Sequence, residues 1–163
     1  MIISGQHPMK EEKSKYILNW IREISKIRPE LGNFAICPYA SGAKFSIQEQ
    51  KLTQIMPNSD FDVIINIVEE DIDSNSLYNA VDDYNRKHPD YKFIADHGKT
   101  STYIQGIQTN NGKYNLVLCL PRKDLTEARK NLAKTNYYDY WDKNYLEEFL
   151  EDDYRIINDE KTR

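Results

Sequence analysis

The sequence has little of what marks several common classes of protein. Only two of its 163 residues are cysteines, Cys37 and Cys119, which are too few for a disulfide framework. The three histidines and two cysteines are not spaced as paired zinc ligands. Six glycines and six prolines argue against a low-complexity chain. No apolar run reaches the roughly 20 residues of a membrane-spanning helix, so we expect no membrane partner.

The sequence also has only a small excess of acidic over basic residues. The 26 acidic and 22 basic residues leave a net charge of −4, which argues against nucleic acid as a partner. The basic stretch from Arg122 to Lys134 is interpreted as the solvated face of a helix. Residues 1–9 lack the features of a signal peptide and are predicted to form a loose leader, so we expect a cytoplasmic protein. Residues 1–163 are expected to form a single domain with a frayed tail at 158–163.

Apolar residues at helical spacing predict helices in the N-terminal, central and C-terminal parts of the chain. Their predicted limits are residues 17–27, from Asp73 or Ser74 to just before Pro89, from a capping box of Asp124 and Glu127 to Leu132, and from near Asn144 onward. Between the helices, alternating or continuous apolar residues predict strands.

The strongest predicted strand covers residues 60–68, where apolar side chains alternate with polar ones. Further strands are predicted at 44–50 and 91–95, and the apolar residues 34–37 are predicted as a strand or a buried loop. Residues 101–120 are predicted as a hairpin that turns at Asn110–Gly112. The second arm of this hairpin is apolar at nearly every position, which predicts a central strand. The whole pattern predicts an α+β fold, with a mostly antiparallel sheet of about four to five strands packed with N-terminal, central and C-terminal helices.

Two aspartates at the start of the strongest strand form the one segment with a recognisable chemical pattern. Asp60 and Asp62 stand two residues apart, and a strand would place both side chains on the same face. Carboxylates arranged in this way can share Mg²⁺, which prefers oxygen ligands and substrate phosphates. Upstream, Ser41 and Gly42 predict a turn whose backbone can approach a phosphate, with Lys44 beside it. Alternatively, the two aspartates are only the polar start of a strand.

These segments resemble the nucleotidyltransferase superfamily, which has the polymerase-β-like fold. Members of that superfamily have a Gly-Ser turn, an Asp-x-Asp strand and a third acid on a later strand. The resemblance covers residues 34–120 and implies a nucleotide and Mg²⁺ held by the paired aspartates. Here the small pair reads Ser41-Gly42, and the position of the third acid falls at Asn115. This difference implies a degenerate member that binds a nucleotide.

A second resemblance rests on Trp20 in the first predicted helix and on Cys37-Pro38 after it. This arrangement is similar to a family of uncharacterised bacterial proteins that carry a Trp helix and then a Cys-Pro-Phe-Ala segment. Residues 88–93, which read His-Pro-Asp-Tyr-Lys-Phe, are similar to a later segment of that family. The resemblance implies a compact single domain and no particular chemistry.

Cys37 is either a candidate nucleophile or a structural thiol. If Pro38 opens a short helix, Cys37 becomes its N-cap, a position that favours the thiolate. His88 and His97 are the candidate bases, and the sequence does not place either of them near Cys37. The apolar neighbours of Cys37 favour the structural interpretation.

The C-terminal region is strongly aromatic, and Tyr137, Tyr140, Trp141 and Tyr145 are candidates for an interaction surface. The same residues also suit a helix packed on the core. Two functions therefore stay open. The first is a non-catalytic binding or regulatory domain that acts through a protein partner or self-association. The second is a nucleotidyltransferase-like domain that binds Mg²⁺ and a nucleotide, so the sequence leaves open whether the protein is an enzyme.

Overall fold

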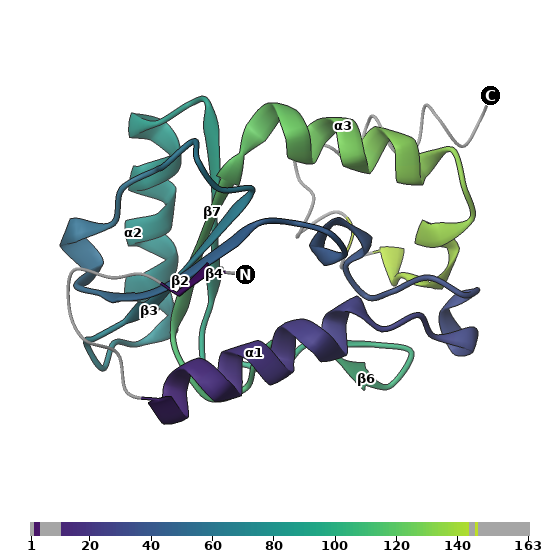
Figure 1. Ribbon diagram of the computed structural model, residues 1–163, viewed down its shortest axis with the longest axis horizontal. Coiled ribbons are helices and arrows are strands. Elements are labelled where there is room, and N and C mark those ends of the chain that lie inside the picture. Colours follow the sequence, from purple (N-terminus) through teal and green to yellow (C-terminus); the bar gives the residue numbers. More distant parts are fainter. Residues whose placement is uncertain (1, 4–10, 144–145, 147–163) are drawn as a thin grey trace.

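The computed structural model describes residues 2–3, 11–143 and 146. They form an α+β fold, as the sequence predicts, with α1 and α2 on opposite faces of a sheet (Figure 1). The longer elements are α1 (Glu11–Ser25), α2 (Ser74–Lys87), α3 (Arg122–Ala133), β2 (Phe45–Gln50), β3 (Val63–Val68), β4 (Tyr91–Asp96) and β7 (Leu116–Pro121). The shorter ones are β1 (Ile2–Ile3), β5 (Tyr103–Ile104), β6 (Ile107–Gln108) and the 3-10 turns η1 (Pro29–Leu31), η2 (Pro38–Ala40), η3 (Leu52–Gln54) and η4 (Tyr137–Tyr140).

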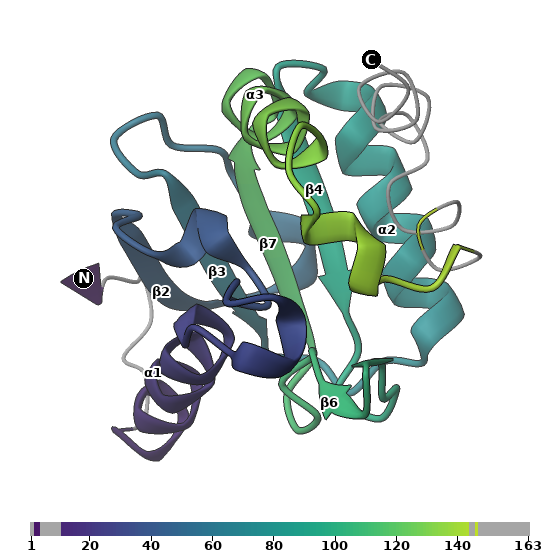
Figure 2. The ribbon, with the colours of Figure 1, turned by 90° about the vertical axis from the view of Figure 1, so that its right-hand side faces the viewer.

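The main sheet is mixed rather than mostly antiparallel. Its strand order is β1-β2-β3-β7-β4, in which β1, β2 and β3 are parallel and β7 is antiparallel to both of its neighbours (Figure 2). A parallel pair needs a connection that crosses back over the sheet. Residues 51–62 supply it on the α2 face, where Ile55 is buried. Hydrophobic alternation reveals strands but not their directions, which explains the error.

The predicted hairpin over residues 101–120 is wrong, although its second arm is the central strand that the sequence predicts. β5 pairs with β6 in a separate small sheet, where Gln105 and Gly106 turn with φ of 52° and 78°. β7 lies between β3 and β4 instead. A strand that is apolar at nearly every position must be covered on both faces. Only the centre of the sheet offers that cover.

The helix predictions are largely confirmed, with corrected ends. α1 stops at Ser25, and Ile27 beyond it is 72% exposed. α2 has Asp73 as its N-cap, whose carboxylate accepts a hydrogen bond from the backbone N–H of Ser76 at 3.1 Å. The predicted capping box is wrong, because α3 follows directly on β7 and Asp124 lies inside its first turn. There the carboxylate still faces the positive end of the helix dipole.

The remaining predicted segments take one of two predicted forms, differ, or lie outside the described residues. Residues 34–37 form the buried loop of the two predicted alternatives, with Ala35 and Ile36 buried, and Phe34 makes an isolated bridge with Arg28. The predicted leader contains β1, and its remaining residues lie outside the described part of the chain, as does the tail at 158–163. Most of the predicted last helix is also outside it. The described helices include none that is long and apolar enough to cross a membrane.

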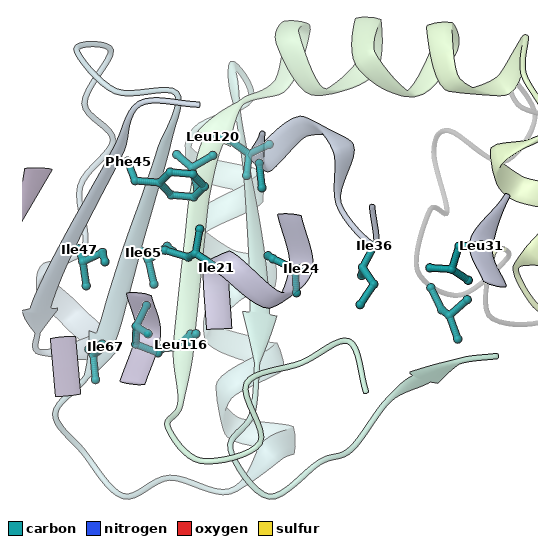
Figure 3. Close-up of a cluster of buried hydrophobic side chains, with 14 residues drawn as sticks. Ile21, Ile24, Leu31, Ile36, Phe45, Ile47, Ile65, Ile67, Leu116 and Leu120 are labelled. Carbon is teal, nitrogen blue, oxygen red and sulfur yellow. The ribbon is translucent and has the colours of Figure 1, made fainter. Parts of the chain in front are cut away.

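The face of the sheet toward α1 holds the larger apolar core. Isoleucines of α1 pack on β2, β3 and β7, and η1 and η2 extend the same core (Figure 3). Its most deeply buried members are Ile17, Ile47, Ile65, Ile67 and Leu116. The helical spacing of the α1 isoleucines therefore correctly predicts its buried face, and the alternation in β3 correctly predicts which side chains face α1. The other face of β3 is buried as well, under α2, which the alternation did not predict.

The face toward α2 holds a second core, which is joined to a polar contact. Leu77 and Val81 of α2 pack on Phe93 of β4 and Val117 of β7. Beside them, the Oδ1 atom of Asn85 accepts a hydrogen bond from the backbone N–H of Phe93 at 2.7 Å. Its Nδ2 atom donates to the carbonyl oxygen of Phe93 at 3.0 Å. One side chain of α2 is thus bonded to the backbone of the outermost strand.

Candidate functional site

The start of β3 brings together part of the predicted phosphate and metal site. The backbone N–H of Lys44 donates to Oδ2 of Asp62 at 2.7 Å, and the N–H of Asp62 donates to the carbonyl oxygen of Lys44 at 2.9 Å. Ser41 and Gly42 form an exposed turn just before, in which Gly42 has a φ of 83°. The predicted turn therefore does lie beside one of the two aspartates.

Asp60 does not share a strand face with its partner. β3 begins only at Val63, and Asp60 is exposed in the turn that precedes it. Its backbone N–H donates to the side-chain oxygen of Asn58 at 2.9 Å. Asn58 thus provides the local turn that ends the 51–62 connection. The prediction that both carboxylates lie on one face of a strand is wrong, because β3 begins only after Asp60 and Asp62.

Asn115 lies at the opposite end of β3 from Asp62. The backbone N–H of Val68 donates to the carbonyl oxygen of Asn115 at 2.9 Å, and Oδ1 of Asn115 accepts from the N–H of Gly98 at 2.9 Å. The length of β3 separates the two positions by roughly 16 Å at the usual rise of a strand. Because β7 is antiparallel to β3, a residue early in β7 cannot supply a third ligand beside Asp62.

Tyr39, which the sequence did not single out, lies near Asp62 instead. The Tyr39 hydroxyl donates to the carbonyl oxygen of Asp62 at 3.5 Å. Burial, together with the carboxylates of Asp124 and Asp62, raises the pKa of Tyr39 to about 12. Within the described ranges, however, no three or more His, Cys, Asp or Glu side chains are grouped so that they could hold a metal ion.

Cys37 is a structural thiol by its surroundings. It is the N-cap of η2 with Pro38 at the first position, as expected from the sequence. Burial nevertheless raises the pKa of its thiol, so the reactive thiolate is disfavoured. His88 packs against Tyr84 and Phe93 on the α2 side, whereas Cys37 packs on the α1 core. His97 is buried and bonds the carbonyl oxygen of Ile72 through Nε2 at 2.6 Å.

The aromatic cluster near the C-terminus faces inward more than the sequence suggests. Tyr137 is 4% exposed, and its hydroxyl donates to the carbonyl oxygen of Ile36. Tyr140 and Trp141 are half-buried, and Tyr145 lies outside the described residues. The Tyr137 ring also meets the Trp141 ring with centroids 5.6 Å apart. Tyr137 is therefore removed from the predicted interaction surface, because its side chain belongs to the core.

A polar pocket lies on the α2 face of the sheet, beside β2. Its walls are Ser46, Gln48 and Gln50 of β2 and five residues of the 54–61 segment, and Ile64 of β3 also lines it. Its volume is about 150 Å³. Alternation along β2 places these three polar residues on one face, while Phe45 and Ile47 face the α1 core. We call this the glutamine pocket.

Hydrogen bonds to the sheet fix the side-chain amide of Gln48 in the glutamine pocket. Nε2 of Gln48 donates to Oδ1 of Asn66 at 2.6 Å, and Nδ2 of Asn66 donates to the carbonyl oxygen of Val117 at 3.0 Å. Asn66 itself is fully buried. The amide of Gln48 is therefore fixed by a chain of hydrogen bonds that ends on β7.

Gln50 differs from the other groups of the pocket. Its side chain is part of the pocket wall, the residue is only 3% exposed, and its Oε1 atom has no hydrogen-bond partner among the described residues. A buried carbonyl oxygen that accepts no hydrogen bond lowers the free energy of unfolding of a protein. In the sequence, the only signal of this pocket is Ser46, Gln48 and Gln50 at every second position of a weak strand. Such polar alternation normally marks a solvated face, so it does not by itself predict a pocket.

Comparison with known proteins gives no relative from which a function can be taken. No family model, curated protein or solved structure matches this chain.

Proposed function

We propose that this chain is a non-catalytic binding domain and that the glutamine pocket is its ligand site. The observation that carries the proposal is Gln50, a residue of the pocket wall whose buried Oε1 atom lacks a donor among the described residues. Native proteins leave few buried polar atoms unpaired, and those that remain call for an explanation. A ligand that donates a hydrogen bond to this atom supplies one.

The proposal keeps the binding role expected from the sequence and moves it to another surface. The aromatic residues first expected to contact a partner pack largely inside, whereas the pocket opens beside Met56, which is 62% exposed. At about 150 Å³, the pocket is smaller than the roughly 300–1,000 Å³ of common ligand sites. It suits a small molecule or one group of a larger partner.

Replacing Gln50 by methionine is expected to raise the free energy of unfolding of the unliganded protein by about 1–2 kcal/mol. The substitution keeps an unbranched side chain of similar length and removes a buried oxygen whose unmet desolvation costs about 1–3 kcal/mol. Urea denaturation of the purified protein measures the change. Residues kept for a ligand commonly lower stability in this way.

Gln54 provides the matched control for this substitution. It lines the same pocket but is exposed, so Gln54→Met is expected to change the free energy of unfolding by less than about 0.5 kcal/mol. A Gln50→Met protein that is less stable than the parent by more than 1 kcal/mol (about the mean effect of a point substitution) would show that Gln50 serves the fold. The proposal would then be wrong.

We propose nucleotide and Mg²⁺ binding as the second candidate function. The contact between Lys44 and Asp62 favours it, because it joins a small-residue turn to a carboxylate. Lys44 also places its Nζ 5.2 Å from the centroid of the Phe61 ring. The same end of the sheet therefore offers a cation for a phosphate and a carboxylate for a metal ion. Asp60, exposed in the adjacent turn, is the other candidate ligand.

If this second function operates, a nucleoside triphosphate with Mg²⁺ is expected to raise the midpoint of thermal unfolding, and Asp62→Asn is expected to abolish the rise. At one hundred times the dissociation constant, binding adds about 2.7 kcal/mol to the stability. The asparagine can still accept the hydrogen bond of the Lys44 N–H, so the fold contact is kept while the charge is lost. Asp139→Asn, an exposed change in η4, is the control. An unchanged midpoint in the parent protein would exclude the second function.

A further inference from the structure

We propose that the glutamine pocket takes an uncharged planar molecule about one ring in size that presents N–H donors, the simplest example being an aromatic carboxamide. This inference rests on the proposed binding function and names its ligand class. It follows from three properties of the pocket: its lack of charge among the described residues, its hydrogen-bond acceptors and its size.

The charge of the pocket excludes ionic ligands. Of the described residues that line it, none carries an ionisable side chain. The walls consist of amides, the Ser46 hydroxyl, and the apolar groups of Met56, Pro57, Phe61 and Ile64. A carboxylate or ammonium group placed there would lose its hydration without gaining an opposite charge from the lining, which is far costlier than burying a neutral amide. The nearby Lys44 ammonium, 5.2 Å from the centroid of the Phe61 ring, is exposed and is not a lining group. The ligand must therefore be neutral in the part that enters.

The hydrogen-bond acceptors of the pocket specify donors on the ligand. Oε1 of Gln50 has no donor among the described residues and is itself buried, so a ligand reaches it when the Gln50 amide turns toward the pocket. The amide of Gln48 commits Nε2 to Asn66, and within the described part of the chain its Oε1 accepts no hydrogen bond. Gln48 and Gln50 are two residues apart on the same face of β2. A ligand with N–H groups satisfies these carbonyl oxygens, and one with only acceptors leaves them unpaired.

The size and lining of the pocket favour a single ring. A cavity of about 150 Å³ is known to accommodate a benzene molecule when its walls are apolar. Here the lining includes Phe61, whose ring can contact a planar ligand in an offset-stacked or edge-to-face arrangement, and it also includes the glutamine amides. A planar ring with a carboxamide edge suits both kinds of lining group, because its ring is apolar and its edge donates.

Three probes of nearly equal shape test this inference: benzamide, benzoate and N,N-dimethylbenzamide. Binding is measured by calorimetry and by ¹H–¹⁵N spectra, in which the amide signals of Ser46 to Gln50 report the pocket. We expect benzamide to bind with a dissociation constant about tenfold lower than either of the others, since each loses a hydrogen bond to a buried acceptor. Gln50→Met is expected to raise the dissociation constant of benzamide by about the same factor. Thr53→Ala, exposed on η3 and not a lining residue, is expected to leave it unchanged.

The outcomes separate this inference from the function on which it rests. If benzoate or N,N-dimethylbenzamide shifts the same signals with equal affinity, the pocket binds ligands but the assigned ligand class is wrong. If none of the three probes shifts these signals, the ligand class is also wrong, and the stability of Gln50→Met then decides whether the pocket is a binding site. If Thr53→Ala weakens the binding of benzamide as much as Gln50→Met does, the assignment of Gln50 as the acceptor is likewise overturned.

Discussion

Replacing Phe93 by alanine is expected to lower the free energy of unfolding by about 3–5 kcal/mol, which is the usual cost of removing a buried phenylalanine. Phe93 is 1% exposed and packs between α2 and the sheet. Its ring lies 5.2 Å from the Tyr84 ring, and both rings belong to the core under α2. Domains are stable by only about 5–15 kcal/mol, so this one change is expected to remove a large part of the stability. Urea denaturation followed by circular dichroism measures the loss.

Tyr103→Ala is the control for Phe93→Ala. Tyr103 is an aromatic residue of a strand too, but it is 56% exposed. Its removal is expected to change the stability by less than about 0.5 kcal/mol. A loss below 1.5 kcal/mol for Phe93→Ala, about half of the smallest usual cost, would mean that α2 closes over the vacated space. The α2 face would then be packed less rigidly than its burial indicates.

Replacing Asn66 by alanine is expected to cost about 2–4 kcal/mol, because a buried carbonyl group and a partly buried amide lose their partners at once. Asn66 is fully buried in β3, where it accepts from Gln48 and donates to the carbonyl oxygen of Val117. Each buried polar group left unpaired costs about 1–3 kcal/mol. The same denaturation measurement gives the change, and the near neighbour Gln48 should show altered amide signals.

Asn66→Asp distinguishes a lost hydrogen bond from lost volume. It keeps the size of the side chain, but its charge would be buried without an opposite partner among the described residues, so the protein is expected to be less stable at pH 7 than at pH 4.5. The carboxyl group is neutral only when protonated, and burial raises its pKa. Asn79→Asp, exposed on α2, is the control without this pH dependence.

A loss of stability below 1 kcal/mol in the Asn66→Ala protein, which is the smallest cost of one unpaired buried group, would mean that water reaches the vacated site.

The sequence was sufficient to predict elements whose side chains repeat with a regular period. The spacing of the α1 isoleucines identified that helix and its buried face, and Asp73 identified the first turn of α2. The apolar character of β7 indicated a central strand, which is confirmed. In each of these cases, the local pattern and the tertiary environment demand the same residues.

The sequence was not sufficient wherever the answer depended on which strands become neighbours. The arms of the predicted hairpin are close in the chain, but β7 pairs with β3 and β4 because burial on both faces outweighs a local turn signal. Asn115 was expected near Asp62 for the same reason: its position along β7 was inferred without the direction of the strand. Asp124 is close enough to Tyr39 to raise its pKa only because α3 starts where β7 ends.

The glutamine pocket illustrates the same point for the candidate site. Ser46, Gln48 and Gln50 look like the solvated face of an edge strand when they are read alone. The 51–62 connection crosses over this face, and it is this long-range contact that encloses them. Periodicity shows which side chains share a face, but it does not show what covers that face.

The contact of Asn85 with Phe93 has a consequence for the growth of the sheet. An outermost strand presents unpaired backbone groups, to which another chain can add a strand and so begin aggregation. On β4, the Asn85 amide occupies both the donor and the acceptor of Phe93 on the side away from β7. An incoming strand would have to displace this side chain and, with it, a turn of α2. The helix that covers the sheet thus also protects it from templated association at this edge.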